Sequence, residues 1–222
     1  MIDAPERTPS GQAAAMRVLL LPGAFGNGAD FAAAGFNDEV RTRDLPLELV
    51  FADLEFRHVT DRSILERLRD GPLAAARRAG CRSVWLAGVS LGAYIALVFA
   101  ERFPGEVDGL CLLAPYLGTR LVSGAIARAG GLARWANVTG ASDDEEERVW
   151  RFAAAPTLPV YVGYGRSDRF ADAQRLLANV LPPSRVDAID GAHDWPTWRT
   201  LWGRFLDRWP LPGEPSAVRI AG

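Results

Sequence analysis

One stretch of the chain reads Trp85-Leu86-Ala87-Gly88-Val89-Ser90-Leu91-Gly92-Ala93-Tyr94. The apolar residues 84–87 predict a buried strand, and the longer apolar segment 91–103 predicts a helix. Between the two lies the pattern Gly-x-Ser-x-Gly, residues 88–92, which at a strand-to-helix turn is typical of a nucleophile elbow. We therefore expect a sharp turn that lifts the Ser90 hydroxyl above a sheet, at the positive end of a helix dipole.

Two glycines frame this serine. A turn this sharp tolerates only small neighbours, because larger side chains two residues away would collide with the serine, and Gly88 and Gly92 meet that requirement. The pattern alone is not specific in a chain with 22 glycines, so the strand and the helix around it carry the argument. The alternative is a glycine-rich turn whose serine has no chemical role.

Length and composition limit the architecture. The 222 residues carry a formal net charge of −2, and 49% of them are hydrophobic, which predicts one globular domain, residues 1–222. The chain has no basic excess typical of nucleic-acid binding and no apolar run of the roughly eighteen residues that a membrane span needs. Residues 1–12 lack the basic and apolar regions of a signal peptide, so we expect a cytoplasmic protein. Flexible tails are expected at 1–15 and 210–222.

The usage of cysteine, lysine and histidine excludes several kinds of chemistry. Cys81 and Cys111 lack metal-ligand spacing, and we interpret them as buried or partly buried thiols in a reducing compartment. All 25 basic residues are arginines, which excludes a Schiff-base lysine, a P-loop lysine and a Ser–Lys pair. The chain has two histidines, His58 and His193, too few for a histidine-rich zinc site. We predict neither a metal nor a cofactor.

Apolar runs and helical patterns alternate along the chain. Buried strands are predicted at 17–21, 47–51, 83–87, 107–113, 158–162 and 185–189. Helices are predicted at about 30–34, at 61–78 with Asp61 as the N-cap, and at 91–103, 171–180 and 194–209. This alternation predicts an α/β fold, with a mostly parallel central sheet and helices on both faces.

Residues 118–156 depart from this alternation. No strand is predicted there, glycines recur, and two helical pieces are expected, the second from about Ser142. The acidic run 143–147 suits the first turn of a helix and needs no functional explanation.

Three residues with complementary chemistry follow three different predicted strands. A serine hydroxyl is a poor nucleophile without an adjacent base, and the base needs a third group that fixes its tautomer. Ser90, Asp168 and His193 each stand in the loop after a strand, and parallel strands end at one edge of a sheet. We predict that the three form a catalytic triad. His58 lies in a polar segment and is interpreted as an exposed loop residue.

Two other acids lie closer to His193 in the sequence. Asp190 and Asp194 flank it, but close neighbours in a chain rarely face one another suitably, so Asp168 is the preferred partner. The alternative for Asp168 is a simple turn aspartate.

A reaction that passes through a tetrahedral intermediate needs N–H donors for the oxyanion. One donor is predicted to be the backbone N–H of Leu91, which follows the serine. The other is expected from the turn at 22–25 after the first strand, where Ala24 and Phe25 both remain candidates and Ala24 is preferred. Gly23, Gly26 and Gly28 do not fit the dinucleotide-binding pattern G-x-G-x-x-G.

Together these motifs resemble the α/β-hydrolase superfamily, in particular its small serine esterases and thioesterases. The resemblance covers residues 17–207 and rests on Gly-Val-Ser-Leu-Gly at 88–92, Gly-Arg-Ser-Asp at 165–168 and Gly-Ala-His-Asp-Trp at 191–195. Many relatives have His-Gly at the oxyanion turn where this chain has Pro22-Gly23, a difference that leaves backbone donors intact. The resemblance implies that residues 118–156 form a short cap inserted into the domain.

Several apolar residues near these turns are candidates for a substrate pocket, although core packing is the alternative for each: Phe25, Tyr94, Tyr116, Leu117, Trp195 and Phe170. Arginines 120, 128 and 134 of the cap segment are interpreted as a solvated face, with recognition of an acidic or carrier-bound acyl group as the alternative. The tryptophans at 195, 198 and 202 repeat at helical spacing, which favours a core stripe over a ligand platform or a homodimer face.

The sequence and the resemblance together imply a cofactor-independent serine hydrolase. Its expected partner is a small or medium carboxylic ester or thioester, cleaved through an acyl-enzyme on Ser90. The same triad could instead pass the acyl group to another acceptor or to peroxide, as an acyltransferase or perhydrolase. A non-catalytic ligand-binding protein on a hydrolase fold is the more distant alternative.

Overall fold

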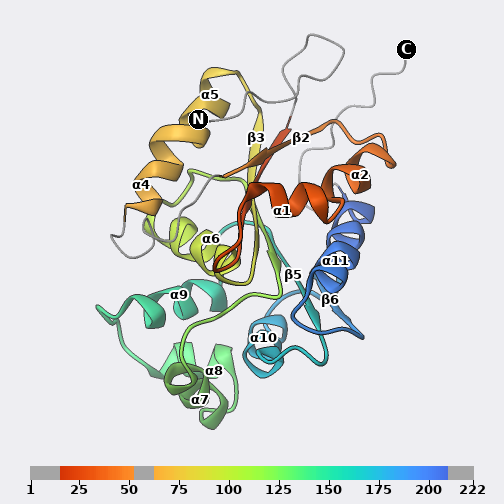
Figure 1. Cartoon of the computed structure of the whole chain (residues 1–222). Helices are drawn as coiled ribbons and strands as arrows, with labels where there is room; N and C mark the ends of the chain where they lie inside the picture. Colours follow the sequence, from red (N-terminus) through yellow and green to blue (C-terminus); the bar gives the residue numbers. More distant parts are fainter. Residues whose placement is uncertain (1–15, 53–62, 210–222) are drawn as a thin grey trace.

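The structure, a computed structural model, describes residues 16–52 and 63–209. The described residues form one six-stranded sheet in the order β2-β1-β3-β4-β5-β6, and every neighbouring pair is parallel (Figure 1). In chain order the strands are β1 (Met16–Leu21), β2 (Leu47–Phe51), β3 (Ser83–Val89), β4 (Gly109–Leu113), β5 (Val160–Gly165) and β6 (Val186–Ile189). The predicted α/β class with a parallel sheet is confirmed.

Two of the predicted strands begin two residues later than expected, each for a local reason. β4 starts at Gly109 rather than at Val107, because the side chain of Asp108 accepts a hydrogen bond from the Val84 N–H at 2.7 Å in place of a ladder partner. β5 starts at Val160 rather than at Leu158, since Pro159 has no N–H to donate to a ladder.

Helices cover both faces of the sheet. One face carries α1 (Gly28–Ala33), α2 (Phe36–Arg41) and α11 (Trp195–Asp207), the last two on the right of Figure 1. The other face carries α4 (Ile64–Leu68), α5 (Ala74–Arg78), α6 (Leu91–Arg102) and α10 (Ala171–Ala178). A separate hydrophobic cluster fills each side, so the strands are buried on both faces, as their continuous apolar runs predict.

The predicted helix 61–78 contains a wider turn. Its described part runs from α4 through the π-helical turn η1 (Arg69–Leu73) into α5, and it begins after Ser63, while Asp61 lies outside the described residues. Pro72 lies inside η1. Proline has no N–H for the carbonyl four residues earlier, and the wider turn accommodates it without ending the helix.

Residues 118–156 contain three helices rather than the expected two. They are α7 (Arg120–Arg128), α8 (Leu132–Val138) and α9 (Glu145–Ala154), with α7 and α8 at the bottom of Figure 1. Asp144 caps α9 by accepting a hydrogen bond from the Glu147 N–H at 3.0 Å, so the acidic run does begin a helix. Trp135 and Trp150 join the core on the α6 side, which makes this segment continuous with the body of the domain.

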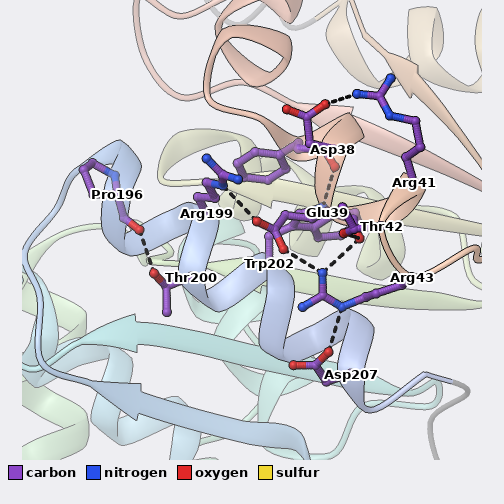
Figure 2. A network of polar contacts seen from close by, with 11 residues as sticks. Asp38, Glu39, Arg41, Thr42, Arg43, Pro196, Arg199, Thr200, Trp202 and Asp207 are labelled. Carbon is purple, nitrogen blue, oxygen red and sulfur yellow. Dashed lines mark hydrogen bonds and ion pairs between the residues drawn. The ribbon is translucent and has the colours of Figure 1, made fainter.

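Helix α2 was not predicted from the sequence, and contacts with α11 hold it in place (Figure 2). The Glu39 carboxylate accepts hydrogen bonds from Arg43 at 2.6 Å and from Arg199 of α11 at 2.8 Å. Arg43 also donates to Asp207 at 2.7 Å. The indole N–H of the buried Trp202, also on α11, donates to the Phe36 carbonyl at 3.1 Å.

The tryptophan stripe of α11 is part of the core, as predicted. Trp202 is fully buried and Trp198 is 8% exposed, while Trp195 is partly buried against the same cluster. Cys111 is buried in β4 and Cys81 is partly exposed, both as free thiols. None of the helices in the described ranges combines the length and the apolar character that crossing a bilayer requires.

Candidate active site

Ser90 lies in a strained turn between β3 and α6. Its backbone φ of 53° and ψ of −115° are unusual for a residue with a side chain. The surroundings fix this conformation, because the Ser90 N–H donates to the Leu113 carbonyl at 3.0 Å and the Ser90 carbonyl accepts from the Tyr116 N–H at 3.1 Å. The end of β4 and the loop after it therefore hold the backbone of the serine on both sides.

The glycines around Ser90 are needed for close approaches of backbone. A Cβ on Gly88 would lie 2.4 Å from the carbonyl carbon of Gly92, and a Cβ on Gly92 would lie 2.1 Å from the Leu21 carbonyl oxygen. The pattern alone predicts that larger side chains at these positions would collide with the serine itself. The collisions are instead with the first turn of α6 and with the end of β1.

The structure brings Ser90, His193 and Asp168 into one hydrogen-bonded line. The Ser90 hydroxyl oxygen lies 2.9 Å from Nε2 of His193, and Nδ1 of His193 lies 2.7 Å from Oδ2 of Asp168. The three residues follow β3, β6 and β5, whose carboxyl ends meet at one edge of the parallel sheet. With a proton on Nδ1, the other ring nitrogen of His193 can accept the serine proton.

Asp168 is a buried carboxylate with three donors. Oδ1 accepts from the Phe170 N–H at 2.8 Å, and Oδ2 accepts from the Gln174 amide at 3.2 Å in addition to His193. Burial is the largest single influence and disfavours the charged form, but the hydrogen bonds from His193, Phe170 and Gln174 together lower the pKa of Asp168 below its ordinary value. The carboxylate is therefore ionised at neutral pH, as a partner of imidazolium must be.

The two rival acids have other partners. Asp190 is exposed and pairs with Arg166 at 2.9 Å. Asp194 caps α11 by accepting from the Thr197 N–H at 3.0 Å. The structure thus brings Asp168 rather than either neighbour to His193.

Aromatic rings and a short turn fix the position of His193. Its ring packs edge-on between Phe170 and Trp198, with centroid distances of 5.1 Å to each. The Thr197 hydroxyl accepts a hydrogen bond from the Ala192 N–H at 3.1 Å, which ties the residue before His193 to the first turn of α11.

The turn at 22–26 lies beside the serine. A Cβ on Gly23 would lie 3.4 Å from the Ser90 Cβ, and the Gly26 N–H donates to the Gly23 carbonyl at 3.1 Å, which closes a β-turn. Phe25 occupies the left-handed position of that turn with φ of 64°, and 89% of its surface is exposed. The turn and the N-terminus of α6 therefore approach Ser90 from two sides, as an oxyanion site requires.

The candidate pocket residues separate into two groups. Tyr94, Tyr116 and Phe170 form a row of ring contacts, 6.0 Å and 5.4 Å between centroids, that continues from Phe170 to the His193 ring. Leu117 instead lies in the core, 3% exposed. Trp195 packs against Phe31, Phe36 and Trp198 beside the opposite core cluster. These contacts agree with the alternative interpretation of core packing for both residues.

Sequence reasoning missed residues that act through the backbone and one buried amide. The Leu113 carbonyl and the Tyr116 N–H hold the nucleophile turn, and Ala114, which lies between them in the sequence, adopts a left-handed φ of 46°. Gln174 reaches Asp168 from α10 and is 0% exposed. A signal did exist, since Gln174 falls on the helix face that also carries Ala171, Leu177 and Ala178, all buried.

His58 lies outside the described residues. Within the described ranges, no group of three or more histidines, cysteines and acids is arranged to hold a metal ion.

Comparison with solved structures places the fold. MGS-MChE2, an alpha/beta hydrolase enzyme from the metagenome of sediments of the Mar Chica lagoon in Morocco, matches with a TM-score of 0.61 and 17% identity over 93% of this chain and 97% of that one. The S-formylglutathione hydrolase FrmB of Staphylococcus aureus matches with a TM-score of 0.59 and 13% identity over 88% and 81%. FphF, a fluorophosphonate-binding serine hydrolase of Staphylococcus aureus, matches with 0.56 and 12% over 91% and 86%.

Sequence comparison adds nothing to this result, because no family model and no curated protein matches the chain. The similarity to solved structures covers nearly the whole chain at low identity. The all-parallel six-stranded sheet of this chain, with helices on both faces, agrees with its similarity to alpha/beta hydrolase structures. The chain therefore has the α/β-hydrolase fold.

Proposed function

We propose that this protein is a serine hydrolase that cleaves a small or medium carboxylic ester or thioester through an acyl-enzyme on Ser90. The observation that carries the proposal is the line of hydrogen bonds from the Ser90 hydroxyl through His193 to Asp168, 2.9 Å and 2.7 Å long. An idle serine in a tight turn would not need an oriented imidazole and an ionised carboxylate behind it.

Each of the three groups has one role in this proposal. Nε2 of His193 takes the hydroxyl proton while the Ser90 oxygen attacks the substrate carbonyl, and Asp168 stabilises the imidazolium that forms. The imidazolium then gives this proton to the departing alkoxide or thiolate, which leaves the acyl group on Ser90. Water, deprotonated by His193 in the same way, attacks the acyl carbonyl; the bond to Ser90 then breaks, the acid leaves, and the imidazolium returns the proton to the Ser90 oxygen.

Backbone N–H groups near Ser90 are suited to the oxyanion. The Leu91 N–H lies at the first position of α6, where the helix supplies no acceptor for it. Ala24 is the other proposed donor, because it follows Gly23, whose α-carbon region abuts the serine. Phe25 remains the alternative. Both segments are backbone, so Pro22 in place of histidine does not remove a donor.

We further propose that the aromatic row Tyr94–Tyr116–Phe170 lines the acyl side of the site and that the segment 118–156 covers it in part. The row leads directly to His193, and α7 follows the loop that carries Tyr116. Proteins of this fold differ in the substrates that their names state, among them S-formylglutathione hydrolase and ferulic acid esterase, so the substrate must be measured.

Covalent labelling tests the proposal. A fluorophosphonate probe is expected to modify Ser90 of the wild type, as located by peptide mapping, and labelling should fall at least about a hundredfold in Ser90→Ala and His193→Ala. Ser167→Ala is the matched control, because this exposed serine precedes Asp168 but is not a member of the hydrogen-bonded line Ser90–His193–Asp168. A panel of p-nitrophenyl esters and matching thioesters of graded acyl length then identifies the substrate class.

Folded wild type that reacts with neither the fluorophosphonate nor a smaller sulfonyl fluoride would refute the hydrolase. Labelling that persists in His193→Ala at the wild-type rate would refute the role of the base. Transfer of the acyl group to an added alcohol or to peroxide faster than to water would assign the acceptor differently while leaving the acyl-enzyme intact.

A further inference from the structure

Gln174 is a fully buried amide that contacts the acid of the triad. It projects from α10, and its Nε2 donates to the Asp168 Oδ2 at 3.2 Å and to the Pro115 carbonyl at 3.1 Å. Oδ2 is the same oxygen that accepts from His193. One amide nitrogen therefore connects the acid to the loop after β4.

The orientation of this amide is fixed by its acceptors. Both neighbours of Nε2, the Pro115 carbonyl and the Asp168 carboxylate, are acceptors, so the opposite orientation would place an oxygen against two oxygens. In the observed orientation the Oε1 atom is buried without a hydrogen-bond partner. A buried unpaired carbonyl oxygen is costly, and an apolar side chain would fill the same space without that cost. Core packing alone therefore does not account for a glutamine here.

The loop that Gln174 contacts also holds the nucleophile. Pro115 precedes Tyr116, whose N–H donates to the Ser90 carbonyl, and follows Ala114, whose N–H donates to Gly163 of β5 at 2.7 Å. The path from Asp168 through Gln174 and Pro115 to Ser90 is thus made of direct contacts. This path does not pass through His193.

We propose that Gln174 is a positioning residue for the reaction, holding the Asp168 carboxylate at a fixed place relative to the loop that carries Ser90. This inference rests on the proposed function, since it concerns the same triad. The amide performs two tasks. It prevents the carboxylate from rotating away from His193, and its N–H stabilises part of the negative charge on Oδ2, the oxygen that also contacts His193. Of the two arginines of this turn, Arg166 pairs with Asp190 at 2.9 Å and Arg169 lies over the Phe170 ring at 4.9 Å.

Two substitutions of matched size separate the donor from the packing. Gln174→Met keeps the length and removes the amide, and Gln174→Glu keeps the shape and replaces the donor by an acceptor beside Asp168. We expect the rate of fluorophosphonate labelling to fall about tenfold in the first and further in the second. Without the donor, more negative charge remains on Oδ2, so the acid limb of the pH–rate profile of Gln174→Met should move to higher pH.

A control variant distinguishes positioning from a loss of stability. Leu177→Ala removes a fully buried side chain from the next turn of α10, on the same face. It should lower the melting temperature at least as much as Gln174→Met and leave the pH profile of labelling unchanged. Wild-type rates and profiles in both Gln174 variants would overturn the proposal, as would an equal loss in Leu177→Ala.

A measurement without any reactive probe keeps this test separate from that of the proposed function. In a His58→Gln background the imidazole resonances belong to His193 alone, because the chain has two histidines. At a fixed pH, the resonance of the ring nitrogen Nδ1, which lies 2.7 Å from Oδ2 of Asp168, should differ between Gln174→Met and the parent. If wild-type Ser90 fails to label but this change occurs, the hydrolase proposal fails while the action of Gln174 on Asp168 stands. No change in the resonances refutes the inference.

Discussion

Gly92 shows how a single missing side chain permits the turn at Ser90. The carbonyl oxygens of Leu21 and Pro22 would lie 2.1 Å and 2.6 Å from a Cβ at this position. Both are backbone atoms at the end of β1, the strand whose following turn is proposed to supply an oxyanion donor. A methyl group there could be accommodated only by moving β1 away from α6.

Gly92→Ala is therefore expected to lower the free energy of unfolding by about 3 kcal/mol or to prevent folding, as overpacking of rigid neighbours does. Gly124→Ala is the matched control, because its Cβ would meet only the flexible end of Arg128, at 3.3 Å, within α7. That control should gain about 0.5–1 kcal/mol from the removal of a helical glycine. Urea unfolding of both variants measures the difference, and equal effects would contradict the role of the close approach.

Buried polar residues such as Gln174 mark the limit of prediction from single residues. Ser90, Asp168 and His193 could be predicted to meet because each type is needed for one chemistry and each follows a strand of one parallel sheet. Gln174 belongs to no motif, and its helix position indicates only that it is buried. What it contacts depends on how α10 is placed over the loop after β4, which no local pattern specifies.

At the scale of secondary-structure elements, α2 and α11 are joined by the ion-pair network of Figure 2. Partial burial of Glu39 disfavours its charge, but the hydrogen bonds from Arg43 and Arg199 outweigh this effect and lower its pKa. A carboxylate whose pKa is lower in the folded state stabilises the fold at pH values above its ordinary pKa. That contribution is lost as the pH falls through the lowered value.

Glu39→Gln should therefore cost about 1–2 kcal/mol of unfolding free energy at pH 7 and much less at pH 3. Asp38→Asn is the control on the same helix, since its pair with Arg41 is exposed and should be worth under about 0.5 kcal/mol. Thermal unfolding of both variants at the two pH values provides the measurement. A cost for Glu39→Gln that does not depend on pH would show that the network contributes only through packing.

The elements that could not be predicted are the short ones that distant contacts hold in place. Six residues suffice for α2 because Phe36 packs against Trp202, 5.5 Å between ring centroids, although 166 residues separate the two. The long apolar strands and α6 could be predicted because most of their own residues are apolar, and such a run indicates burial without knowledge of distant contacts. Helix α8 was missed for the same reason as α2. It has seven residues, and it is held in place by Trp135, which packs into the α6-side cluster.

At the scale of the whole molecule, both hydrophobic clusters share the same six strands. Val18 and Leu20 of β1 face one cluster, while Leu19 and Leu21 face the other. If the strands separate from one cluster, the apolar residues on their opposite face are exposed as well. We therefore propose that the described residues unfold as one cooperative unit, the single domain expected from the sequence.

Tryptophan fluorescence can test whether the described residues unfold together, because it can be made to report on one face of the sheet alone. Trp135 and Trp150 are the two tryptophans in the α6-side cluster, so replacing both by phenylalanine leaves the emission of the α11 side. The urea transition seen by this emission should coincide with the transition seen by far-ultraviolet circular dichroism, which reports all helices. Two separated midpoints would mean that the faces unfold independently.

The spread of the three site residues along the chain has a consequence for synthesis. Ser90 emerges from the ribosome 103 residues before His193, and Asp168 emerges between them. An incomplete chain therefore carries a serine without its base, and the hydroxyl remains as inert as any other until β6 and α11 have been made and have docked. Under the proposed function, a chain truncated before His193 therefore has no ester-cleaving activity.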